Sequence, residues 1–398
     1  MITTNILPEI KTQNSILKNY EIKKLRLKHN LTQKELSDAL GLPKFGDRTI
    51  RRWENGESKP STLENSFLLD FFQALENKPF QIKEIKEYKM IDLFAGIGGT
   101  RLGFQLTGRV GVVFTSEWDK FAQKTYFANF GEIPHGDITL IDESDIPNHD
   151  ILVAGFPCQA FSQAGKKLGF EDTRGTLFFD VARIIKAKRP KAFLLENVKN
   201  LKTHDKGRTY QTIISTLEEL NYATFSVLFK AREFGCPQNR ERIYIVGFDK
   251  NTINNFNQFE FPIPPTPETK LASILQDSVP DKYTISDKLW EGHQRRKAQH
   301  KKNGNGFGYS LFTPESPYTN TLSARYYKDG SEILIEQIGK NPRKLTPREA
   351  ARLQGFPEDF IIPVSDTQSY KQFGNSVCVP VINAIASQIL KILDKQFQ

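Results

Sequence analysis

The chain has 398 residues, enough for two or three domains and a large core, and 38% of them are hydrophobic, as in an ordinary globular protein. Its formal net charge of +9 favours a polyanionic partner, although net charge by itself defines no activity. The first residues lack a signal-peptide pattern, and no run approaches the roughly 18 apolar residues of a membrane span. We therefore expect a cytoplasmic protein without membrane contact.

The positive charge lies in two regions, residues 1–60 and residues 281–344, and each holds 12 Lys and Arg against 7 Asp and Glu. Two such regions predict two nucleic-acid contacts, and a solvated basic face is the alternative for each. The three cysteines, Cys158, Cys236 and Cys378, lie far apart and include no CxxC pair. This spacing indicates neither a zinc site nor a disulfide framework, so we expect no metal.

Residues 1–80 carry apolar positions at helical spacing, which predicts an all-α domain. The segment LTQKELSDALGLPKFGDRTIRRWENGESKPS predicts a short helix after Thr32, a break at Gly41, and a second helix from about Asp47. It resembles the helix-turn-helix of phage-repressor-type DNA-binding domains. That resemblance places the second helix in the major groove and brings four of its side chains near bases or phosphates: Arg48, Thr49, Arg51 and Arg52. A plain helical hairpin used for oligomer contacts is the alternative.

From Tyr88 onward, apolar runs of strand length alternate with helical segments. The expected strands are KMIDLF, GVVFTSE, DILVAGF, KAFLLENV, YATFSVLF and RIYIVGF. Such alternation predicts an α/β fold with a doubly wound parallel sheet, formed by residues 88–270 and 341–398. A Pro-rich connector leads out of this body, and the basic, weakly periodic residues 271–340 predict a smaller irregular domain.

The first strand of this sheet turns through Gly96 and Gly98 into a helix. Glycines at this point let a ligand approach the backbone closely. The next strand ends at Glu117 and Trp118, where an acidic side chain can bind a ribose diol, and we expect a third strand to end near Asp137, which can accept from an adenine amino group. Because the full GxGxxG fingerprint is missing, a nucleoside without a diphosphate fits best, and the expected cofactor is S-adenosylmethionine.

Cys158 follows the apolar strand DILVAGF on a Gly-rich segment, at the carboxyl edge where open α/β sheets place their sites. A thiol in this position is a candidate nucleophile. A free cysteine that packs as a small hydrophobic residue is the alternative.

Six segments then occur in one order: DLFAGIGG, GFPCQAFSQAG, LLENVKNL, QNRERIYIVGF, LTPREAARLQGFP and QFGNSVCVPVI. Through them, residues 88–398 resemble the DNA (cytosine-5)-methyltransferases of the bacterial restriction-modification type. The resemblance implies a Rossmann-like S-adenosylmethionine-dependent methyltransferase sheet with a target-recognition domain in residues 271–340. It also implies methyl transfer to carbon 5 of a flipped-out cytosine in a specific short duplex DNA sequence, with S-adenosylhomocysteine as the second product.

The same resemblance assigns the site residues. Cys158 adds to carbon 6 of the cytosine, and Glu196 protonates or hydrogen-bonds its N3. Arg240 and Arg242, at i and i+2 on one face of an extended segment, reach the cytosine O2 and the catalytic loop. The cofactor residues are Phe94, Gly96, Gly98, Glu117, Trp118, Asp137, Pro157 and Asn375. The residues expected to contact the methylated DNA are Gln159, Ser162, Gln163, Thr321, Arg325 and Lys328.

Two alternatives stay open at this point. A transfer RNA cytosine-5 methyltransferase would use the same catalytic set, but the helix-turn-helix and the basic recognition region favour double-stranded DNA. A transcriptional repressor with an inactive methyltransferase body is the second, and the intact catalytic set weighs against it. We expect a bacterial, cytoplasmic enzyme that acts as a monomer on its methylation site and whose first domain binds the operator of its own operon.

Overall fold

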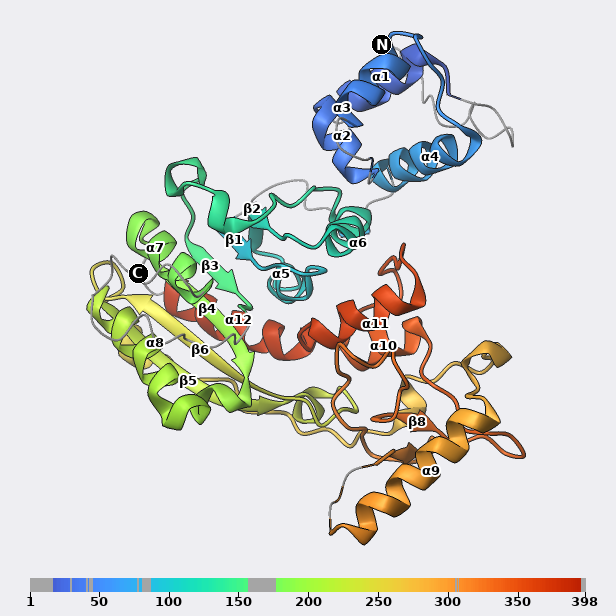
Figure 1. Cartoon of the computed structure of the whole chain (residues 1–398). Coiled ribbons are helices and arrows are strands. Elements are labelled where there is room, and N and C mark those ends of the chain that lie inside the picture. The colour runs from blue at the N-terminus through green and yellow to red at the C-terminus, as the bar shows by residue number, and fades with distance from the viewer. Residues whose placement is uncertain are drawn as a thin grey trace. The chain divides into compact units, whose positions relative to one another are not determined.

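The computed structural model describes residues 17–28, 31–40, 42, 46–76, 79–80, 87–156, 177–304, 306 and 308–394 (Figure 1). The chain divides into two compact units, one of residues 1–81 and 127–133 and the other of residues 82–126 and 134–398. Residues 271–340 belong to the same compact unit as the sheet. The separate domain that the sequence predicts for these residues therefore stays a prediction.

The described part of the first unit contains the helices α1 (Asn19–Lys28), α2 (Gln33–Ala39), α3 (Gly46–Glu54) and α4 (Thr62–Glu76). α2 and α3 are the two short helices that the sequence predicts. Their apolar side chains recur at helical spacing and meet in one small core, in which Leu36, Ile50 and Trp53 are buried. Burial of this stripe turns the charged side of α3 to solvent.

The second unit is built on one six-stranded sheet in the order β2-β1-β3-β4-β6-β5. Its strands are β1 (Tyr88–Leu93), β2 (Val110–Ser116), β3 (Ile151–Ala154), β4 (Ala192–Val198), β5 (Tyr222–Lys230) and β6 (Glu241–Asp249). All six strands expected from the sequence are therefore confirmed. The sheet is mixed rather than wholly parallel, because β6 runs antiparallel to both β4 and β5.

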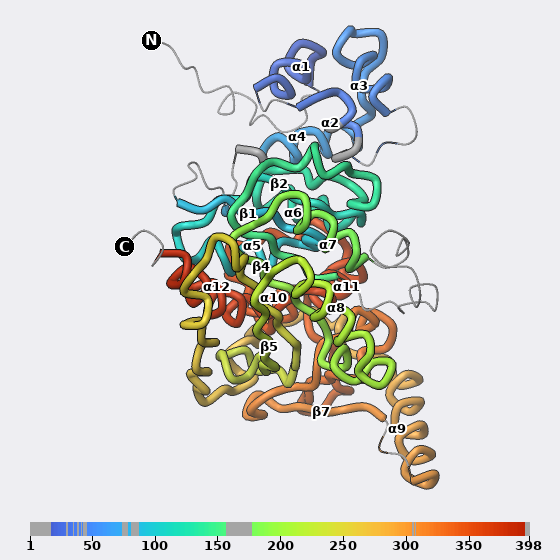
Figure 2. The backbone as a smooth tube through the Cα atoms, turned by 90° about the vertical axis from the view of Figure 1, so that its left-hand side faces the viewer, coloured from blue at the N-terminus to red at the C-terminus, as the bar shows by residue number. Residues whose placement is uncertain are grey.

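Helices cover both faces of this sheet, as a doubly wound fold requires (Figures 1 and 2). Side chains alternate along β3, so that Ile151 and Val153 pack under α5 and α12 while Leu152 and Ala154 pack under α7 and α8. The helices of this unit are α5 (Gly99–Gln105), α7 (Leu177–Lys188), α8 (Arg208–Glu219), α9 (Asp287–Lys302), α10 (Pro347–Leu353), α11 (Asp366–Asn375) and α12 (Val379–Asp394). The helix α6 (Lys120–Phe130) also begins in this unit, and its residues 127–130 are assigned to the first.

Residues 271–340 are mostly irregular, as expected, and contain the short strands β7 (Leu311–Phe312) and β8 (Leu334–Ile335). They also contain α9, a 16-residue helix that the sequence analysis missed. The physical reason is that His293 is the single buried residue of α9. The helix therefore has no apolar stripe from which a helical period could be recognised in the sequence.

The stretch Asp366–Asp394 is long and apolar enough, by composition, to cross a membrane, which the sequence analysis did not anticipate. In the structure its second part, α12, belongs to the core: Val381, Ile385 and Ile389 are buried in the cluster that lies against β1 and β3. Its apolar character is accounted for by this packing between the sheet and the rest of the unit.

Gly247 on β6 lies opposite Phe193 on β4, and a Cβ atom at this glycine would overlap the Phe193 ring. Gly247→Ala should therefore destabilise the protein by about 1–3 kcal/mol through overpacking, seen as a fall of several degrees in melting temperature. Gly292→Ala is the control, because its Cβ would meet open space and alanine favours the helix. Equal melting temperatures for the two variants would contradict the packing described here.

Candidate active site

The carboxyl ends of β1 and β2 meet at one edge of the sheet, since Leu93 pairs with Ser116. From β1 the chain turns through Phe94, Gly96 and Gly98, all with positive φ, into α5. Glu117 follows β2 directly, and its Oε2 accepts a hydrogen bond of 2.8 Å from the Gly96 backbone N–H. Parallel pairing thus brings together two groups that are twenty-one residues apart in sequence.

The Glu117 carboxylate is held from both sides, because its Oε1 accepts a 2.8 Å hydrogen bond from the Asp119 backbone N–H. Burial raises the pKa of this carboxyl, and the backbone hydrogen bonds act against that rise. Trp118, the next residue, is 75% exposed, and a Cβ at Gly96 would meet open space. A fixed acceptor beside an open backbone turn and a free aromatic face fits the ribose and adenine of a nucleoside.

Two other residues expected at the cofactor, Asp137 and Asn375, are not hydrogen-bonded to Glu117 in the described structure. We had expected a strand to end near Asp137, and this expectation was wrong. Asp137 caps a 3₁₀ turn, and its Oδ1 accepts a hydrogen bond from the Thr139 N–H at 3.0 Å. Asn375 is the last residue of α11 and is exposed. Its neighbour Ser376 packs against the start of α5, where a Cβ at Gly99 would come within 2.7 Å of the Ser376 Oγ.

The candidate catalytic pair lies where β4 and β6 meet. Glu196 is near the end of β4, and the antiparallel register places Arg242 of β6 opposite Val198. The Arg242 Nε is 3.1 Å from the Glu196 Oε1, and the two side chains are only 15% and 13% exposed. Burial raises the pKa of the Glu196 carboxyl, and the charges of Arg242 and Arg240 oppose that rise.

The Glu196 carboxylate also faces the strand that leads to the candidate nucleophile. Its Oε2 lies 3.6 Å from the position of a Cβ on Gly155, three residues before Cys158. Asn197 adds a second link, because its Nδ2 donates to the Phe156 carbonyl at 2.8 Å. The sequence analysis did not identify Asn197, although it stands next to Glu196 in the Glu-Asn-Val triplet.

Residues 157–176 lie outside the described residues. Five predicted site residues fall in this range: Pro157, Cys158, Gln159, Ser162 and Gln163. Their roles stay predictions. The described structure brings the end of β3 up to Glu196 and Asn197, immediately before this segment.

Arg240 is buried and makes contacts that differ from those expected. Its guanidinium donates to the carbonyls of Leu322 at 3.2 Å, of Gly374 at 3.1 Å and of Ser376. Burial lowers its pKa to about 9, and the neighbouring charge of Arg242 adds to that fall. The contact of Arg240 with the base stays a prediction. Its observed hydrogen bonds connect the sheet to two later segments of the chain.

Gln238, another residue that the sequence analysis missed, adds hydrogen bonds to this connection. It is fully buried, its Oε1 accepts from the Leu322 N–H at 2.8 Å, and its Nε2 donates to the Leu353 carbonyl at 3.2 Å. Nearby, the Thr321 hydroxyl donates to the Asn239 carbonyl at 2.9 Å. The segment that begins at Thr321, predicted to read DNA, is therefore fastened directly to the strand that carries Arg242.

Residues 88–391 match the family model for C-5 cytosine-specific DNA methylases, and residues 22–64 match a helix-turn-helix model. The chain belongs to the C-5 cytosine-specific DNA methylase family. It is 71% identical over 374 residues to the Type II methyltransferase M1.ScrFI of Lactococcus lactis subsp. cremoris, covering 94% of this chain and 95% of that protein. It is 66% identical over 373 residues to the Type II methyltransferase M.SsoII of Shigella sonnei, covering 94% and 98%.

Among solved structures, the S. pombe Dnmt2 methyltransferase matches with a TM-score of 0.63 at 19% sequence identity, covering 77% of this chain and 100% of that one. At this identity the match shows the fold alone. The sequence-based assignments of fold, family and enzyme class are confirmed: the protein is a DNA methyltransferase that acts on carbon 5 of cytosine.

The other two cysteines of the methylase are structural. Cys236 and Cys378 are free and buried, with their sulfur atoms 2.7 Å apart. The contact with Cys378, together with burial, raises the pKa of the Cys236 thiol well above its ordinary value. Because both thiols are buried against each other, neither is placed to attack a substrate, and Cys158 stays the candidate nucleophile.

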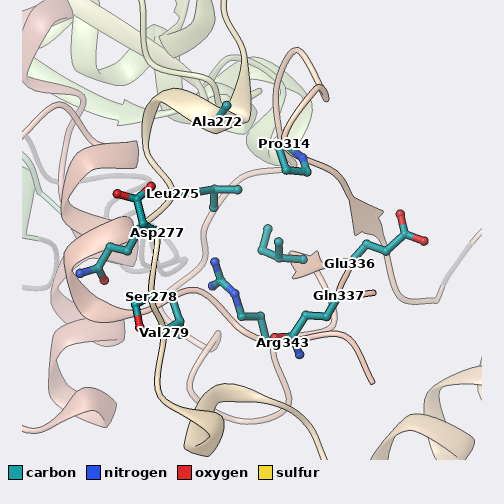
Figure 3. Close-up of a pocket in the computed structure, with 11 residues that line it drawn as sticks. Ala272, Leu275, Asp277, Ser278, Val279, Pro314, Glu336, Gln337 and Arg343 are labelled. Atoms are coloured by element: carbon teal, nitrogen blue, oxygen red, sulfur yellow. The ribbon is translucent and has the colours of Figure 1, made fainter. Parts of the chain in front are cut away.

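The methylase also has a cavity of about 550 Å³ among residues 272–343, lined by Leu275, Gln337 and Arg343 among others (Figure 3). It contains none of the glycine-turn or Glu196 residues. Its arginine is already neutralised, because both terminal nitrogens of Arg343 donate to the buried Glu349 at 2.8 Å. The cavity is therefore not the cofactor site. Among the described residues, no group of three His, Cys, Asp or Glu side chains could hold a metal ion.

In the first unit, α3 presents the residues expected to contact DNA. Arg48, Arg51 and Arg52 are exposed and Thr49 is half-buried. The helix is held in place by a buried ion pair that the sequence analysis did not identify, in which the Arg26 Nε of α1 lies 2.5 Å from the Glu54 Oε1. The unit thus fixes one basic helix face while leaving it open to solvent.

Asp92, at the edge of the glycine turn, generates a pH prediction. It is buried, its Oδ2 has no hydrogen-bond partner among the described residues, and burial raises its pKa to about 8. Between about pH 4 and pH 8 the folded protein then holds a proton that the unfolded chain has released, so stability falls as pH rises. Asp92→Asn removes this dependence, and its melting temperature relative to the wild type should rise from pH 5 to pH 8. A constant difference across these pH values would contradict the raised pKa.

Proposed function

We propose that this methylase transfers the methyl group of S-adenosylmethionine to one cytosine of a short duplex sequence and protects host DNA in a Type II restriction-modification system. Its relatives M1.ScrFI and M.SsoII are named as Type II methyltransferases. The observation that carries the proposal is the buried Glu196–Arg242 pair beside Gly155, which follows β3 and stands three residues before Cys158 in the sequence. The enzyme acts in the bacterial cytoplasm, as a monomer on its methylation site.

The chemistry of the base explains why this arrangement suits the reaction. Carbon 5 of cytosine is too weak a nucleophile to accept a methyl group until another nucleophile has added at carbon 6. The Cys158 thiolate forms a bond to carbon 6, and the displaced electron pair of the ring makes carbon 5 nucleophilic. After methylation, loss of the carbon 5 proton expels the thiolate and restores the ring.

Glu196 acts on the other side of the same ring. The addition is favoured when N3 receives a hydrogen bond or a proton, and a carboxyl whose pKa is raised by burial can donate it. Arg242 supplies a fixed positive charge next to this carboxyl, where it can stabilise density on the cytosine O2. Arg240 holds the segment that carries Arg242 in position through its three backbone carbonyl partners.

S-adenosylmethionine supplies the methyl group and leaves as S-adenosylhomocysteine. Gly96 and Gly98 leave room for it at the turn, and Glu117 offers a carboxylate already oriented by two backbone amides. Four further residues complete the proposed pocket: Phe94, Trp118, Pro157 and Asn375. The Asp137 carboxylate is already engaged in capping a turn, so Asp137 is the candidate with the least capacity left for a ligand.

The target cytosine must leave the helix, because carbon 6 is attacked from the face of the ring, which is stacked in a duplex. Gln159, Ser162 and Gln163 are proposed to contact the phosphates or fill the gap that the base leaves. Arg325 and Lys328, which are exposed, contact bases or backbone on the recognition side.

Bisulfite sequencing of DNA from a host that expresses the protein tests this proposal. One short sequence context should be protected from conversion at a single cytosine position. Protection in transfer RNA alone, with none in DNA, would overturn the proposal in favour of the transfer RNA alternative.

The catalytic assignment predicts a covalent complex. The wild type, incubated with cofactor and a duplex that carries 5-fluorocytosine at its target, should form a complex that survives denaturing electrophoresis, because fluorine cannot leave as the carbon 5 proton does. Cys158→Ser should form none, and Glu196→Gln should slow methylation by about 10²- to 10⁴-fold. Glu219→Gln, on the exposed side of α8, is the control and should behave as the wild type. Trapping by the serine variant would refute the assignment.

We also propose that the helix-turn-helix unit binds the operator of the methylase's own operon. The support is the exposed basic face of α3 within the segment that matches the helix-turn-helix model. Such a face can donate hydrogen bonds to base edges in the major groove and to phosphates.

Replacing Arg51 and Arg52 together by alanine should abolish a nuclease footprint upstream of the methylase's coding region and leave methylation of the target sequence intact. Lys59→Ala removes an exposed charge of the same unit outside α3 and serves as the control. A footprint that persists in the double variant, or that is absent from the wild type, would overturn the regulatory role.

A further inference from the structure

The helix α9 carries a concentration of positive charge that the proposed reaction does not use. It holds six Lys and Arg against two acidic residues, and its last eight residues, Arg295–Lys302, contain five Lys and Arg and no acid. Basic residues in the last turn of a helix are favoured by the helix dipole. That effect is confined to one turn and leaves Arg295 unexplained.

One side of α9 is anchored, and the anchor engages two of these cations. The buried His293 donates from Nε2 to the Asp329 carbonyl at 3.3 Å and accepts at Nδ1 from Arg296 at 2.8 Å. Lys297 lies 4.1 Å above the centre of the Tyr309 ring. Arg296 and Lys297 are therefore part of the attachment of the helix to its neighbours.

The remaining cations point elsewhere. Lys288, Arg295 and Lys302 stand at i, i+7 and i+14, which places them along one face of the helix in steps of about 10 Å, on the side away from His293. Together with Lys301 they are exposed, and none forms an ion pair within the described part of the chain. Glu291 shares this face near Lys288, so the uncompensated charge lies in the carboxyl half.

The position of α9 connects this charge to the catalytic edge. Asp329, which binds His293, lies in the same short segment, residues 321–330, whose start is held by Gln238 and Arg240. Arg240 stands just before β6, two residues from Arg242, which is the β6 member of the Glu196–Arg242 pair. In both views α9 runs along the outer border of the target-recognition region (Figures 1 and 2). The helix is thus mounted on the segment expected to read the DNA.

We propose that the outer face of α9 binds the phosphate backbone of the substrate duplex beside the base pairs that are read. This inference rests on the proposed function, because it takes duplex DNA as the substrate. Long, flexible, unpaired cations match closely spaced phosphates without requiring a particular base. This face of α9 contributes to the affinity for DNA and to its salt dependence. It affects neither the choice of sequence nor the rate of the chemical step.

The test uses the full-length protein with Lys288, Arg295 and Lys302, the three cations of the outer face, replaced together by glutamine, which keeps helix propensity. The matched control replaces Lys89, Lys250 and Lys391, three exposed lysines that lie near the opposite ends of the strands. The dissociation constant for a target duplex is measured against salt concentration, with KM, kcat and the bisulfite pattern. Two duplexes are compared, one trimmed close to the site and one with flanks of about ten base pairs, one turn of the helix.

The α9 variant should bind the long duplex at least tenfold more weakly, and the slope of log K against log salt should shrink by up to about 2.7, the value for three lost phosphate contacts. KM should rise with kcat and sequence choice unchanged, and lengthening the flanks should no longer improve binding. The control should follow the wild type on both duplexes.

A salt slope and KM equal to those of the wild type would overturn the proposal, as expected if α9 instead served a protein partner. A fall in kcat with KM unchanged would also overturn it, since the helix would then act on the chemistry. If the wild type methylates no DNA, the proposed function fails together with this inference, whereas failure of the α9 variant to differ leaves the proposed function standing.

Discussion

Arg240 is the residue on which the geometry of the site depends. Its guanidinium is buried at the start of β6 and donates to carbonyls of residues 322, 374 and 376, which come from the recognition region and from the C-terminal helices. A guanidinium suits this task because its five donors are fixed in one plane and it keeps its charge in a buried setting better than an amine would. Close packing seals the same junction, since a Cβ at Gly374 would overlap the backbone of Ser323 and Ala324.

The Glu196–Arg242 pair gains its chemical character from this frame. Burial favours the protonated carboxyl and the adjacent arginine favours the ionised one, so the two effects oppose each other at a single group. Burial is the larger effect and the pKa is raised, which suits the proton-donor role proposed for Glu196. Asn197 contributes by donating a hydrogen bond to the Phe156 carbonyl, so that β4 positions both Glu196 and the residues that lead to Cys158.

The charges of the chain divide between compact units of different use. In the first unit the buried Arg26–Glu54 pair is structural, while the arginines of α3 are exposed. In the second, several arginines are buried in the fold, including Arg240 and Arg343, whereas all six Lys and Arg of α9 are exposed. Net charge therefore says little about where nucleic acid would bind until burial separates structural cations from accessible ones. The family assignment to DNA methylases favours the DNA reading over the transfer RNA alternative.

The sequence by itself determined the family, the α/β class and all six strands, because these follow from local motifs and from apolar periods that need no knowledge of distant contacts. The same motifs name Cys158 and Glu196 as nucleophile and acid, and these two roles stay predictions. It also placed Glu117 at a strand end, where the structure finds it bound to Gly96. Only the tertiary structure decided that β6 runs antiparallel, that Asp137 caps a turn, and that Arg240 joins three segments while its neighbour Arg242 pairs with Glu196. Those outcomes depend on which residues far apart in the chain become neighbours, and two arginines of one motif look alike until burial and register give them different partners.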